Sequence, residues 1–491
     1  MKKTLRIHEH DNVAIVLESI QQGEMIEDIQ AIDFIPKGHK IALKSIDSNE
    51  AILKYGYPIG KAKSPILPGM HVHVHNVHTG LGDILNYEYV PTFQSLTNRF
   101  QHKNIEVYPR LDGTFGIRNE IWIIPTVGCI VSLAQRIANK FQQLHPQTSY
   151  FDGVHVFGHP FGCSQMGDDL NNTKETLQNI SLHPNAGAVL VLGLGCENNR
   201  IKEFEQTYDH SLHRIAFLQT QDVEDEITES IKILEQFYEQ MKQDVRITKS
   251  ISVLNVGLKC GGSDAFSGIS ANPLVGRFSD YLTSLGGTTV LTEVPEMFGA
   301  ETILMSRAQD ETVFQKTVQM INQFKEYYKA HNQVIYDNPS PGNKDGGITT
   351  LEDKSLGCTQ KGGNSIVVDV LEHTQRLKKP GLNLISAPGN DLVSTTTLGM
   401  CGCQMVLFTT GRGTPFGGFI PTLKISSNSD IYKKKPSWID FNAGQLLDGI
   451  DNDQVLEDFI DLIVQVANGK KTNNELNDFR EIAIFKDGVT L

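Results

Sequence analysis

The chain has 491 residues, of which 39% are hydrophobic and 21% are charged, a balance typical of a globular protein with more than one domain. Its formal net charge of −13 argues against a nucleic-acid partner, because phosphate binding needs clustered Lys and Arg. No apolar run has the length of a membrane span or a secretion signal, and the seven cysteines show no disulfide spacing. We therefore expect a cytoplasmic protein with reduced thiols and no membrane partner.

The first 80 residues are predicted to form a small all-β domain. The β-like segments NVAIVLESI, IALKSI, AILKYGYPIG and HVHVHNV follow one another, and Gly and Pro separate them. Residues 81–105 are polar and aromatic without a clear period. They are interpreted as a linker, or as an arm laid over the next domain.

Residues 106–248 are predicted to form a first α/β domain, because apolar strand-like runs now alternate with loops and helix-like segments. The predicted strands are residues 121–126, 154–157, 188–192 and 214–218. Residues 249–491 repeat this alternation, with predicted strands at 251–256, 288–291, 382–387 and 405–409. The predicted class is thus α/β, with an N-terminal β domain followed by two Rossmann-like segments.

One segment of the second α/β domain, residues 338–363, is predicted to be a long loop. It is rich in Gly and Pro and carries Lys, Asp, Glu, Thr and Cys. Loops of this length in compact domains are usually functional or disordered, and this mixture of side chains favours a function.

The sharpest spacing is HVHVHN, with His71, His73 and His75. On a strand, residues two apart share a face, so the three imidazoles would form a platform for Fe, Mn, Zn or Ni. The alternative is a solvated strand face, or histidines that pair with carboxylates.

Four cysteines follow predicted strands in Gly-containing loops: Cys129, Cys163, Cys196 and Cys260. Ligands of open α/β sheets bind at the carboxyl ends of the strands, so these thiols are predicted to converge on one cleft, with Cys163 as a metal-ligand candidate. The alternative is that each cysteine packs as a small apolar residue. Iron–sulfur ligation remains open, although the usual close cysteine spacings are missing.

Carboxylates and polar groups also follow the predicted strands. Glu293 is a candidate metal ligand, and Asp264 and His159 are candidate proton donors; helix capping is the alternative for Asp264. Arg412 and Lys354 are the candidate anion-binding groups, although Arg412 would equally brace a loop. Asn198 and Asn390 are candidates for binding hydroxyl groups, with turn formation as the alternative.

Long strings of this sequence resemble one family through nearly the whole chain. They include FGCSQMGDD, HPNAGAVLVLGLGCENN, CGGSDAFSGISANP, TEVPEMFGAE, NPSPGNKDGGITTLEDKSLGCTQK and TGRGTPFGG, which are similar to those of the altronate/galactarate dehydratase family, and most of all to its altronate dehydratases. The resemblance implies a SAF-type, β-clip-like N-terminal domain and a need for Fe²⁺, or alternatively Mn²⁺ or another divalent cation. It supports His73 and His75 as metal ligands more than His71.

The resemblance implies a hydro-lyase of hexuronate degradation that converts D-altronate to 2-dehydro-3-deoxy-D-gluconate and water. On chemical grounds we assign the metal to His73, His75, Glu293 and Cys163. Arg412 would hold the substrate carboxylate. Lys354, with a pKa lowered by burial, would take the C2 proton, and Asp264 or His159 would protonate the departing hydroxyl. We expect a homodimer.

Three alternatives remain open from the sequence. The substrate is another sugar acid, such as galactarate; the protein is an iron–sulfur hydro-lyase that uses three clustered thiols; or it is a sugar-acid-binding module without catalysis. The charged loops that follow the strands of the long α/β part argue against the last.

Overall fold

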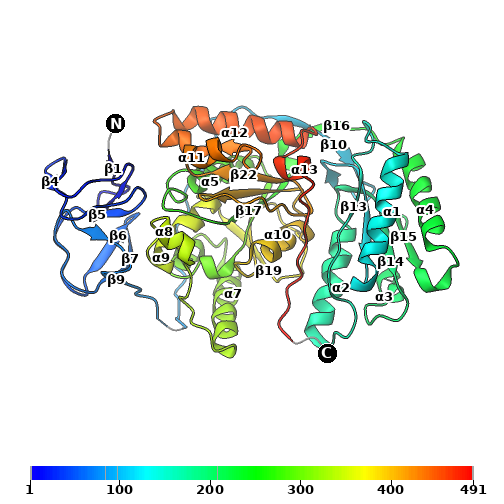
Figure 1. Ribbon diagram of the computed structural model, residues 1–491, viewed down its shortest axis with the longest axis horizontal. Helices are drawn as coiled ribbons and strands as arrows, with labels where there is room; N and C mark the ends of the chain where they lie inside the picture. Colours follow the sequence, from blue (N-terminus) through cyan, green and yellow to red (C-terminus); the bar gives the residue numbers. More distant parts are fainter. Residues whose placement is uncertain (1–2, 83, 97, 207, 489–491) are drawn as a thin grey trace.

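Figure 1 shows the computed structural model of the chain, which describes residues 3–82, 84–96, 98–206 and 208–488. A β-rich N-terminal part is followed by two parallel sheets with helices around them, which confirms the predicted fold class. Among the described residues, no helix is both long and apolar enough to cross a membrane.

The N-terminal domain is built from short antiparallel strands. Its sheets have the orders β1-β2-β5-β8, β6-β7-β9 and β3-β4. The strands are β1 Thr4–Leu5, β2 Val13–Val16, β3 Met25–Ile26, β4 Ile29–Gln30, β5 Lys40–Ala42, β6 Ala51–Lys54, β7 Tyr57–Ala62, β8 His71–Val72 and β9 Val77–His78. The predicted strand through HVHVHN is therefore too long: β8 ends at Val72, because Asn76 closes a turn by accepting a hydrogen bond from the His73 N–H.

The segment after this domain is an arm. Between residues 81 and 103, the described residues form no helix or strand. The Tyr87 hydroxyl donates to Glu301, and the Tyr89 hydroxyl donates to the Ala308 carbonyl. The arm thus lies along the second α/β domain, and not along the first, which is next in sequence.

The first α/β domain has a parallel sheet of order β13-β12-β14-β15. Its elements are β12 Glu120–Pro125, α1 Val131–Leu144, β13 Val154–Val156, α2 Gly167–Ser181, β14 Ala186–Gly193, α3 Ile201–Glu205, β15 Ile215–Gln219 and α4 Glu226–Met241. Alternate residues of the buried strands face opposite layers: one face packs on α1 and α4, and the other on α2, α3 and the second α/β domain. A small antiparallel sheet of β10 Asn104–Pro109, β11 Phe115–Gly116 and β16 Ile247–Ser250 adjoins it.

The second α/β domain has a seven-stranded parallel sheet of order β19-β20-β18-β17-β21-β22-β23. The strands are β17 Asn255–Cys260, β18 Thr288–Leu291, β19 Val367–Leu371, β20 Gly381–Ile385, β21 Met405–Thr410, β22 Thr422–Ser426 and β23 Phe441–Asn442. The helices are α5 Ala271–Ser284, α6 Glu301–Met305, α7 Glu311–Ala330, α8 Pro341–Asp345, α9 Leu351–Cys358, α10 Asp391–Met400, α11 Ser429–Lys434, α12 Asn452–Ala467 and α13 Asn473–Leu476.

Two predictions for this domain are wrong in detail. The strand predicted at 251–256 begins at Asn255, because Ser250 caps a 3₁₀ turn over Ile251–Val253. Cys260 is therefore the last residue of β17 and does not lie in the following loop. The predicted loop 338–363 contains α8 and α9, since Ser340 forms a capping box with Asn343 and Thr350 caps the N–H of Asp353.

Candidate active site

The carboxyl ends of β17, β18 and β20 open onto a polar cavity of about 400 Å³, a size that suits a small metabolite. Its lining comes from the loops that follow these strands and from α7, α8 and α9, and includes Glu296, Asn338, Asn343, Lys354 and Asp391. Ligands of open parallel sheets bind at this edge. The cavity is therefore the candidate active site.

Lys354 is the one predicted site residue that lines this cavity directly. Its ammonium lies 2.7 Å from Glu296 Oε1 and donates to the side-chain oxygens of Asn338 and Asn343. Burial alone lowers the pKa of Lys354, but the carboxylate of Glu296 and the nearby thiols outweigh burial and raise this pKa above its ordinary value. The expected lowering of the pKa is therefore wrong, and Lys354 is held as an ammonium.

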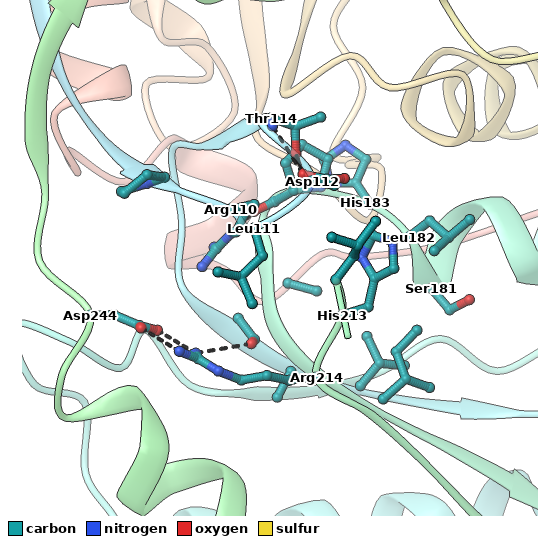
Figure 2. A pocket seen from close by; sticks show the side chains of 18 residues that line it. Arg110, Leu111, Asp112, Thr114, Ser181, Leu182, His183, His213, Arg214 and Asp244 are labelled. Carbon is teal, nitrogen blue, oxygen red and sulfur yellow. Dashed lines mark hydrogen bonds and ion pairs between the residues drawn. The ribbon is translucent and has the colours of Figure 1, made fainter. Parts of the chain in front are cut away.

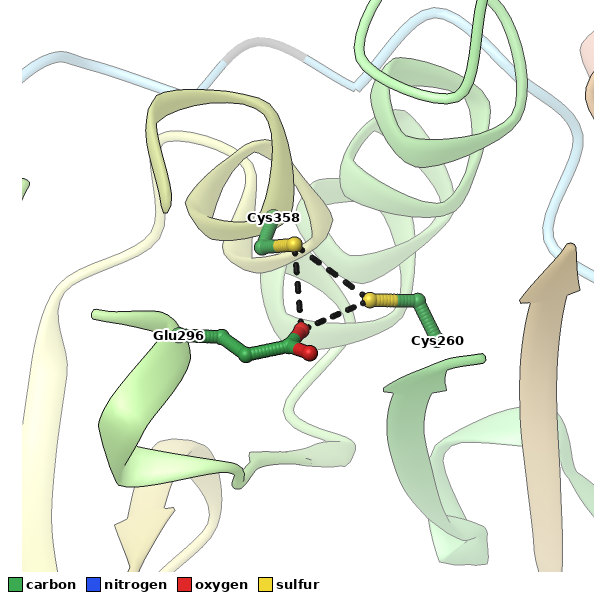
Figure 3. Close-up of side chains that lie close together, drawn as sticks. All are labelled: Cys260, Glu296 and Cys358. Carbon is green, nitrogen blue, oxygen red and sulfur yellow. Dashed lines mark hydrogen bonds between the residues drawn. The ribbon is translucent and has the colours of Figure 1, made fainter. Parts of the chain in front are cut away.

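Beneath the cavity, two thiols and one carboxylate meet (Figure 3). Cys260 Sγ and Cys358 Sγ lie 3.3 Å apart, and both donate to Glu296 Oε2, at 3.0 and 3.1 Å. This is the only group of three or more His, Cys, Asp or Glu side chains in the described part of the chain whose ligand atoms all lie within 4.8 Å of one another. The Lys361 ammonium donates to Cys260 Sγ at 2.8 Å, so a cation of the protein already neutralises this group.

The network continues under the sheet edge to the far side of the cavity. Lys361 Nζ lies 3.6 Å from Glu293 Oε2, and Glu293 Oε1 lies 2.6 Å from Lys259 Nζ. Lys259 in turn donates to Asp391 Oδ1 at 2.8 Å, and Asp391 lines the cavity. Ammonium groups and carboxylates thus form a continuous path from Lys354 to Asp391 that passes through the Cys260 thiol.

Glu293 is fully buried in this path and has a left-handed backbone, with φ 69° and ψ 63°. A non-glycine residue in this conformation is strained, and such strain is concentrated at functional sites. Oε2 of Glu293 accepts the Cys260 N–H at 3.0 Å. Burial, followed by the charge of Glu296, raises the pKa of Glu293.

Three other predicted residues lie around the cavity. Arg412 is exposed. It lies at the edge of the cavity beside α8, because a Cβ added to Gly342 would lie 3.7 Å from Arg412 Nε. Asn390 precedes Asp391 and caps α10, where its side chain accepts the N–H groups of Leu392 and Val393. Asp264 is buried and accepts four hydrogen bonds that tie its loop to the end of β22, from Ser267 twice, Ser427 and Asn428.

The predicted histidine platform lies elsewhere, at the edge of the N-terminal domain. His71, His73 and His75 are joined by His39, which directly precedes β5 and whose Nδ1 lies 3.0 Å from His71 Nε2. The His71 ring centroid is 5.7 Å from that of His73 and 5.1 Å from that of His75. Burial lowers the pKa of His71 to about 4 and that of His73 to about 3. His71 and His73 are therefore neutral imidazoles, the form that binds metals.

The remaining predicted residues belong to the first α/β domain. His159 is buried, with Nε2 2.8 Å from the Pro125 carbonyl oxygen and Nδ1 accepting the Phe161 N–H. Asn198 accepts the Ser164 N–H, and Cys163 is exposed. The residues predicted as one metal site, His73, His75, Glu293 and Cys163, thus lie in three different parts of the fold, and the structure does not bring them together.

Comparison with known proteins supports this division into three parts. Residues 2–80 match the altronate/galactarate dehydratase SAF domain, residues 107–242 the D-galactarate dehydratase/altronate hydrolase second domain, and residues 251–490 the D-galactarate/altronate dehydratase C-terminal domain. The chain belongs to the D-galactarate/altronate dehydratase family. Within this family, it is 54% identical to altronate dehydratase of Escherichia coli (strain K12), over 99% of both chains.

Two further members of the family show how far the likeness extends. Altronate dehydratase of Bacillus subtilis (strain 168) is 53% identical over 100% of both chains. Galactarate dehydratase (L-threo-forming) of Escherichia coli (strain K12) is 32% identical over 95% of this chain and 93% of its own. The likeness to both altronate dehydratases therefore spans the cavity, the histidine group and the first α/β domain.

A second cavity in this family member, of about 190 Å³, lies at the amino ends of β14 and β15 (Figure 2). It is lined by charged side chains that already have partners. Arg214 pairs with Asp244 at 2.6 Å, and Arg110 donates to the carbonyls of Pro184 and Arg118 and to Asn119. Its charged groups are thus satisfied within the protein, and the opposite edge of a parallel sheet is where ligands bind.

Sequence reasoning missed several members of the buried network, namely Lys259, Cys358, Lys361 and Asp391. It counted Glu296 among the carboxylates that follow strands, with helix capping as the alternative, but gave it no role in the site. One signal was available: Lys259 interrupts the apolar run of β17 and is fully buried. A lysine is almost never fully buried unless it is paired. The others come from segments far apart in the sequence, so no local pattern indicates them.

Proposed function

We propose that this chain is a hydro-lyase that converts D-altronate to 2-dehydro-3-deoxy-D-gluconate and water. Two relatives named altronate dehydratase, 54% and 53% identical over nearly full length, support the substrate. One structural observation carries the chemistry: a buried acid–base network has both its ends, Lys354 and Asp391, in the lining of one cavity. The dehydration of a sugar acid needs one group that removes a proton and one that supplies it.

Lys354 and Asp391 are assigned to these two roles. The C2 hydrogen of a 2,3-dihydroxy acid is weakly acidic, because its loss places charge on the carboxylate. Asp391, a carboxylate at the cavity, takes this proton. The ammonium of Lys354 gives a proton to the departing 3-hydroxyl, so that the C2–H and C3–O bonds break, a C2=C3 bond forms and water leaves. The enol product then tautomerises to the 2-keto acid.

The network returns Asp391 and Lys354 to their starting protonation states after each turnover. Asp391 ends the reaction with an extra proton, and Lys354 ends it one proton short. The path through Lys259, Glu293 and Lys361, then Cys260 and Glu296, links them by contacts of 2.6–3.6 Å. Net transfer along this path restores both groups without bulk water entering the buried part.

The polar rim of the cavity suits the rest of the substrate. Arg412 at the edge would bind the carboxylate through parallel N–H donors. Asn338 and Asn343, already hydrogen-bonded to Lys354, offer amide groups to the hydroxyls. Asp264 and Asn390 are assigned to holding the loops in place.

Iron is the proposed metal, with Mn²⁺ as the alternative. The histidine group supplies nitrogen ligands, because burial lowers the pKa of His71 and His73 and keeps these two imidazoles neutral. The rings would have to move closer together around one ion, since the histidines do not form a group of three ligand atoms within 4.8 Å of one another. His71, His73 and His75 would hold the ion, which when bound supplies positive charge for oxygen ligands. The metal content of His73→Ala and His75→Ala, measured beside that of the exposed control His10→Ala, tests this. Metal content equal to wild type in both variants would exclude this site.

The substrate is tested with the full chain, purified without oxygen and supplied with ferrous iron. D-altronate and galactarate are offered separately, and the 2-keto product is measured. We expect turnover of D-altronate at least about tenfold above that of galactarate in kcat/KM. Turnover of galactarate alone would make the substrate assignment wrong. Binding without turnover of any sugar acid would make the hydro-lyase assignment wrong.

The finer expectations about the molecule are also proposals. We infer a homodimer that works in the cytoplasm, where thiols such as Cys260 and Cys358 stay reduced. The mass in solution, measured by light scattering, tests the dimer, and a monomer at micromolar concentration would contradict it.

A further inference from the structure

Three cysteines are presented side by side at the carboxyl edge of the first α/β sheet. The strands β13, β12 and β14 are neighbours in this sheet, and β12 pairs with both others. Each is followed within a few residues by a cysteine, in the order Cys163, Cys129 and Cys196. Neighbouring strands lie about 4.8 Å apart, so the topology places the three cysteine-bearing loops next to one another.

The loops that carry these thiols are fastened to one another. The Gly128 N–H donates to the Phe161 carbonyl at 2.8 Å, and the Asn198 N–H donates to the Gly162 carbonyl at 3.0 Å. The Asn199 amide closes the third side by donating to the Thr126 carbonyl at 3.0 Å. Each cysteine is within two residues of one of these bonds. The thiols are therefore held by a rigid frame.

Two further features keep this frame close-packed. A Cβ on Gly162 would lie 2.2 Å from the Thr126 carbonyl oxygen, so only glycine fits between these two loops. Glu197 is buried next to Cys196, where it accepts the Thr126 hydroxyl and the N–H groups of Leu194 and Gly195. The packing side of each loop is thus fixed, and the thiol side is left open.

The exposure of the three thiols is unusual. Cys129, Cys163 and Cys196 are exposed, whereas the other four cysteines of the chain are buried. Free cysteine is among the most buried residue types and packs as a small apolar group. Exposure of all three at one sheet edge is not explained by packing, and it indicates a ligand.

The spacing of the three thiols distinguishes between a single metal ion and a polynuclear cluster as their ligand. A single zinc or iron ion needs its sulfur ligands in direct contact around it, and these three do not form a group with ligand atoms within 4.8 Å. A polynuclear cluster spreads its cysteine ligands over separate iron atoms, so their sulfurs lie farther apart.

We propose that Cys129, Cys163 and Cys196 bind a four-iron, four-sulfide cluster. Three protein thiolates leave one iron without a protein sulfur, free to take an oxygen ligand such as water, a hydroxyl or a carboxylate. The site rests on this geometry and not on the proposed dehydration.

The cysteine loops adjoin the candidate active site through one apolar cluster. Phe161, two residues before Cys163, packs in the same cluster as Leu392, which follows Asp391. On the other side, the N–H groups of Asp487 and Gly488 donate to Asp169 of α2, and His331, beyond α7, pairs with Asp487. The α7 helix carries Tyr328 of the cavity lining. The first α/β domain is therefore joined to the surroundings of the cavity in two ways. One is the apolar cluster that contains Phe161 and Leu392, and the other is the segment at residues 487 and 488, which contacts Asp169 and His331.

The test uses the full chain, purified without oxygen or reconstituted with ferrous iron, sulfide and a thiol reductant. We expect about four acid-labile sulfide per chain and about four iron in addition to the ion proposed at the histidine group, with broad visible absorption that dithionite bleaches. Cys129→Ser, Cys163→Ser and Cys196→Ser should each lower the sulfide content at least about fivefold. The control Ser164→Ala, beside Cys163 and also exposed, should keep it. Circular dichroism confirms that each variant is folded.

The outcomes separate this site from the proposed function. Iron without sulfide, or sulfide that persists in all three serine variants, would overturn the cluster. Iron that is lost in His73→Ala but kept in the serine variants would also overturn it, and would leave the metal at the histidine group. A cluster that follows the cysteines in a protein without turnover of D-altronate would support the site and make the function wrong.

Discussion

The two parallel sheets carry cysteines at the same edge but treat them in opposite ways. In the second α/β domain, Cys260 and Cys358 are buried, because α9 covers the strand ends. In the first, Cys129, Cys163 and Cys196 remain exposed. The topology therefore places cysteines at the carboxyl edge of both sheets, and the layer above each edge decides their surroundings. In the second sheet they join buried charged groups beside the cavity, whereas in the first they face solvent.

The largest effect is expected at the covered edge. Replacement of Lys354 by Met removes the proposed proton donor and should lower kcat about 10³-fold, within the range for general acid catalysis. The control Lys344→Met, on α8 and outside the cavity lining, should retain activity. Product formation is measured under saturating D-altronate. Near-normal kcat in Lys354→Met would mean that the covered edge does not supply the proton.

The second prediction tests what covers this edge. Asp353, at the start of α9, accepts Lys40 Nζ at 2.9 Å and Lys54 Nζ at 2.8 Å, and all three side chains are buried. Asp353→Asn leaves two buried ammonium groups without a counter-charge, so we expect a loss of about 3–5 kcal/mol in unfolding free energy. Urea unfolding, followed separately in the N-terminal and α/β domains, measures the loss.

A matched control spans the same two domains. Lys37 of the N-terminal domain pairs with Asp430 of α11 at 2.7 Å, but both side chains are exposed. Asp430→Asn should therefore cost less than about 1 kcal/mol. Equal effects of Asp353→Asn and Asp430→Asn would show that burial does not distinguish these pairs, and that the N-terminal domain is not held over the edge by Asp353.

The third prediction sharpens the difference in exposure. In protein stripped of iron, iodoacetamide should alkylate Cys129, Cys163 and Cys196 at least about tenfold faster than the four buried cysteines, because only an accessible thiol reacts without unfolding. Peptide mass spectrometry over time measures each site. Fast labelling of Cys260 or Cys358 would show that the covered edge opens in solution.

The sequence predicted which segments lie at the carboxyl edges of the two sheets better than it predicted which side chains contact one another there. Periodicity placed most strands and thereby located Glu293 and the cysteine loops at carboxyl ends, whereas Lys354 was singled out by its residue type within the predicted loop 338–363. It could not pair Lys354 with Glu296, so the sign of the Lys354 pKa shift came out wrong. That sign depends on a contact between α9 and the turn after β18, which are far apart in the sequence.

The histidine group shows the same limit. The spacing of His71, His73 and His75 is local and was visible in the sequence, but His39 joins them only because β5 pairs with β8. Glu293 and Cys163 were grouped with these histidines on the basis of ligand chemistry alone. Residue type and position after a strand indicate which side chains can bind a metal, whereas the packing of domains decides which of them share a site.

The smallest effect concerns a carboxyl group outside both edges. Burial raises the pKa of Asp440 to about 6, although it accepts the N–H groups of Lys424 and Asn473. A carboxyl whose folded pKa is raised contributes stability below its unfolded pKa, and this contribution is lost as the pH rises through about 6. Asp440→Asn should remove this loss, which for a rise of the pKa from 3.8 to about 6 is about 3 kcal/mol at most. The unfolding free energies of wild type and Asp440→Asn, measured between pH 4 and pH 7, approximately the span of this titration, test the prediction. Parallel curves would show that Asp440 does not titrate in this range. Curves that converge at low pH would support the raised pKa of Asp440.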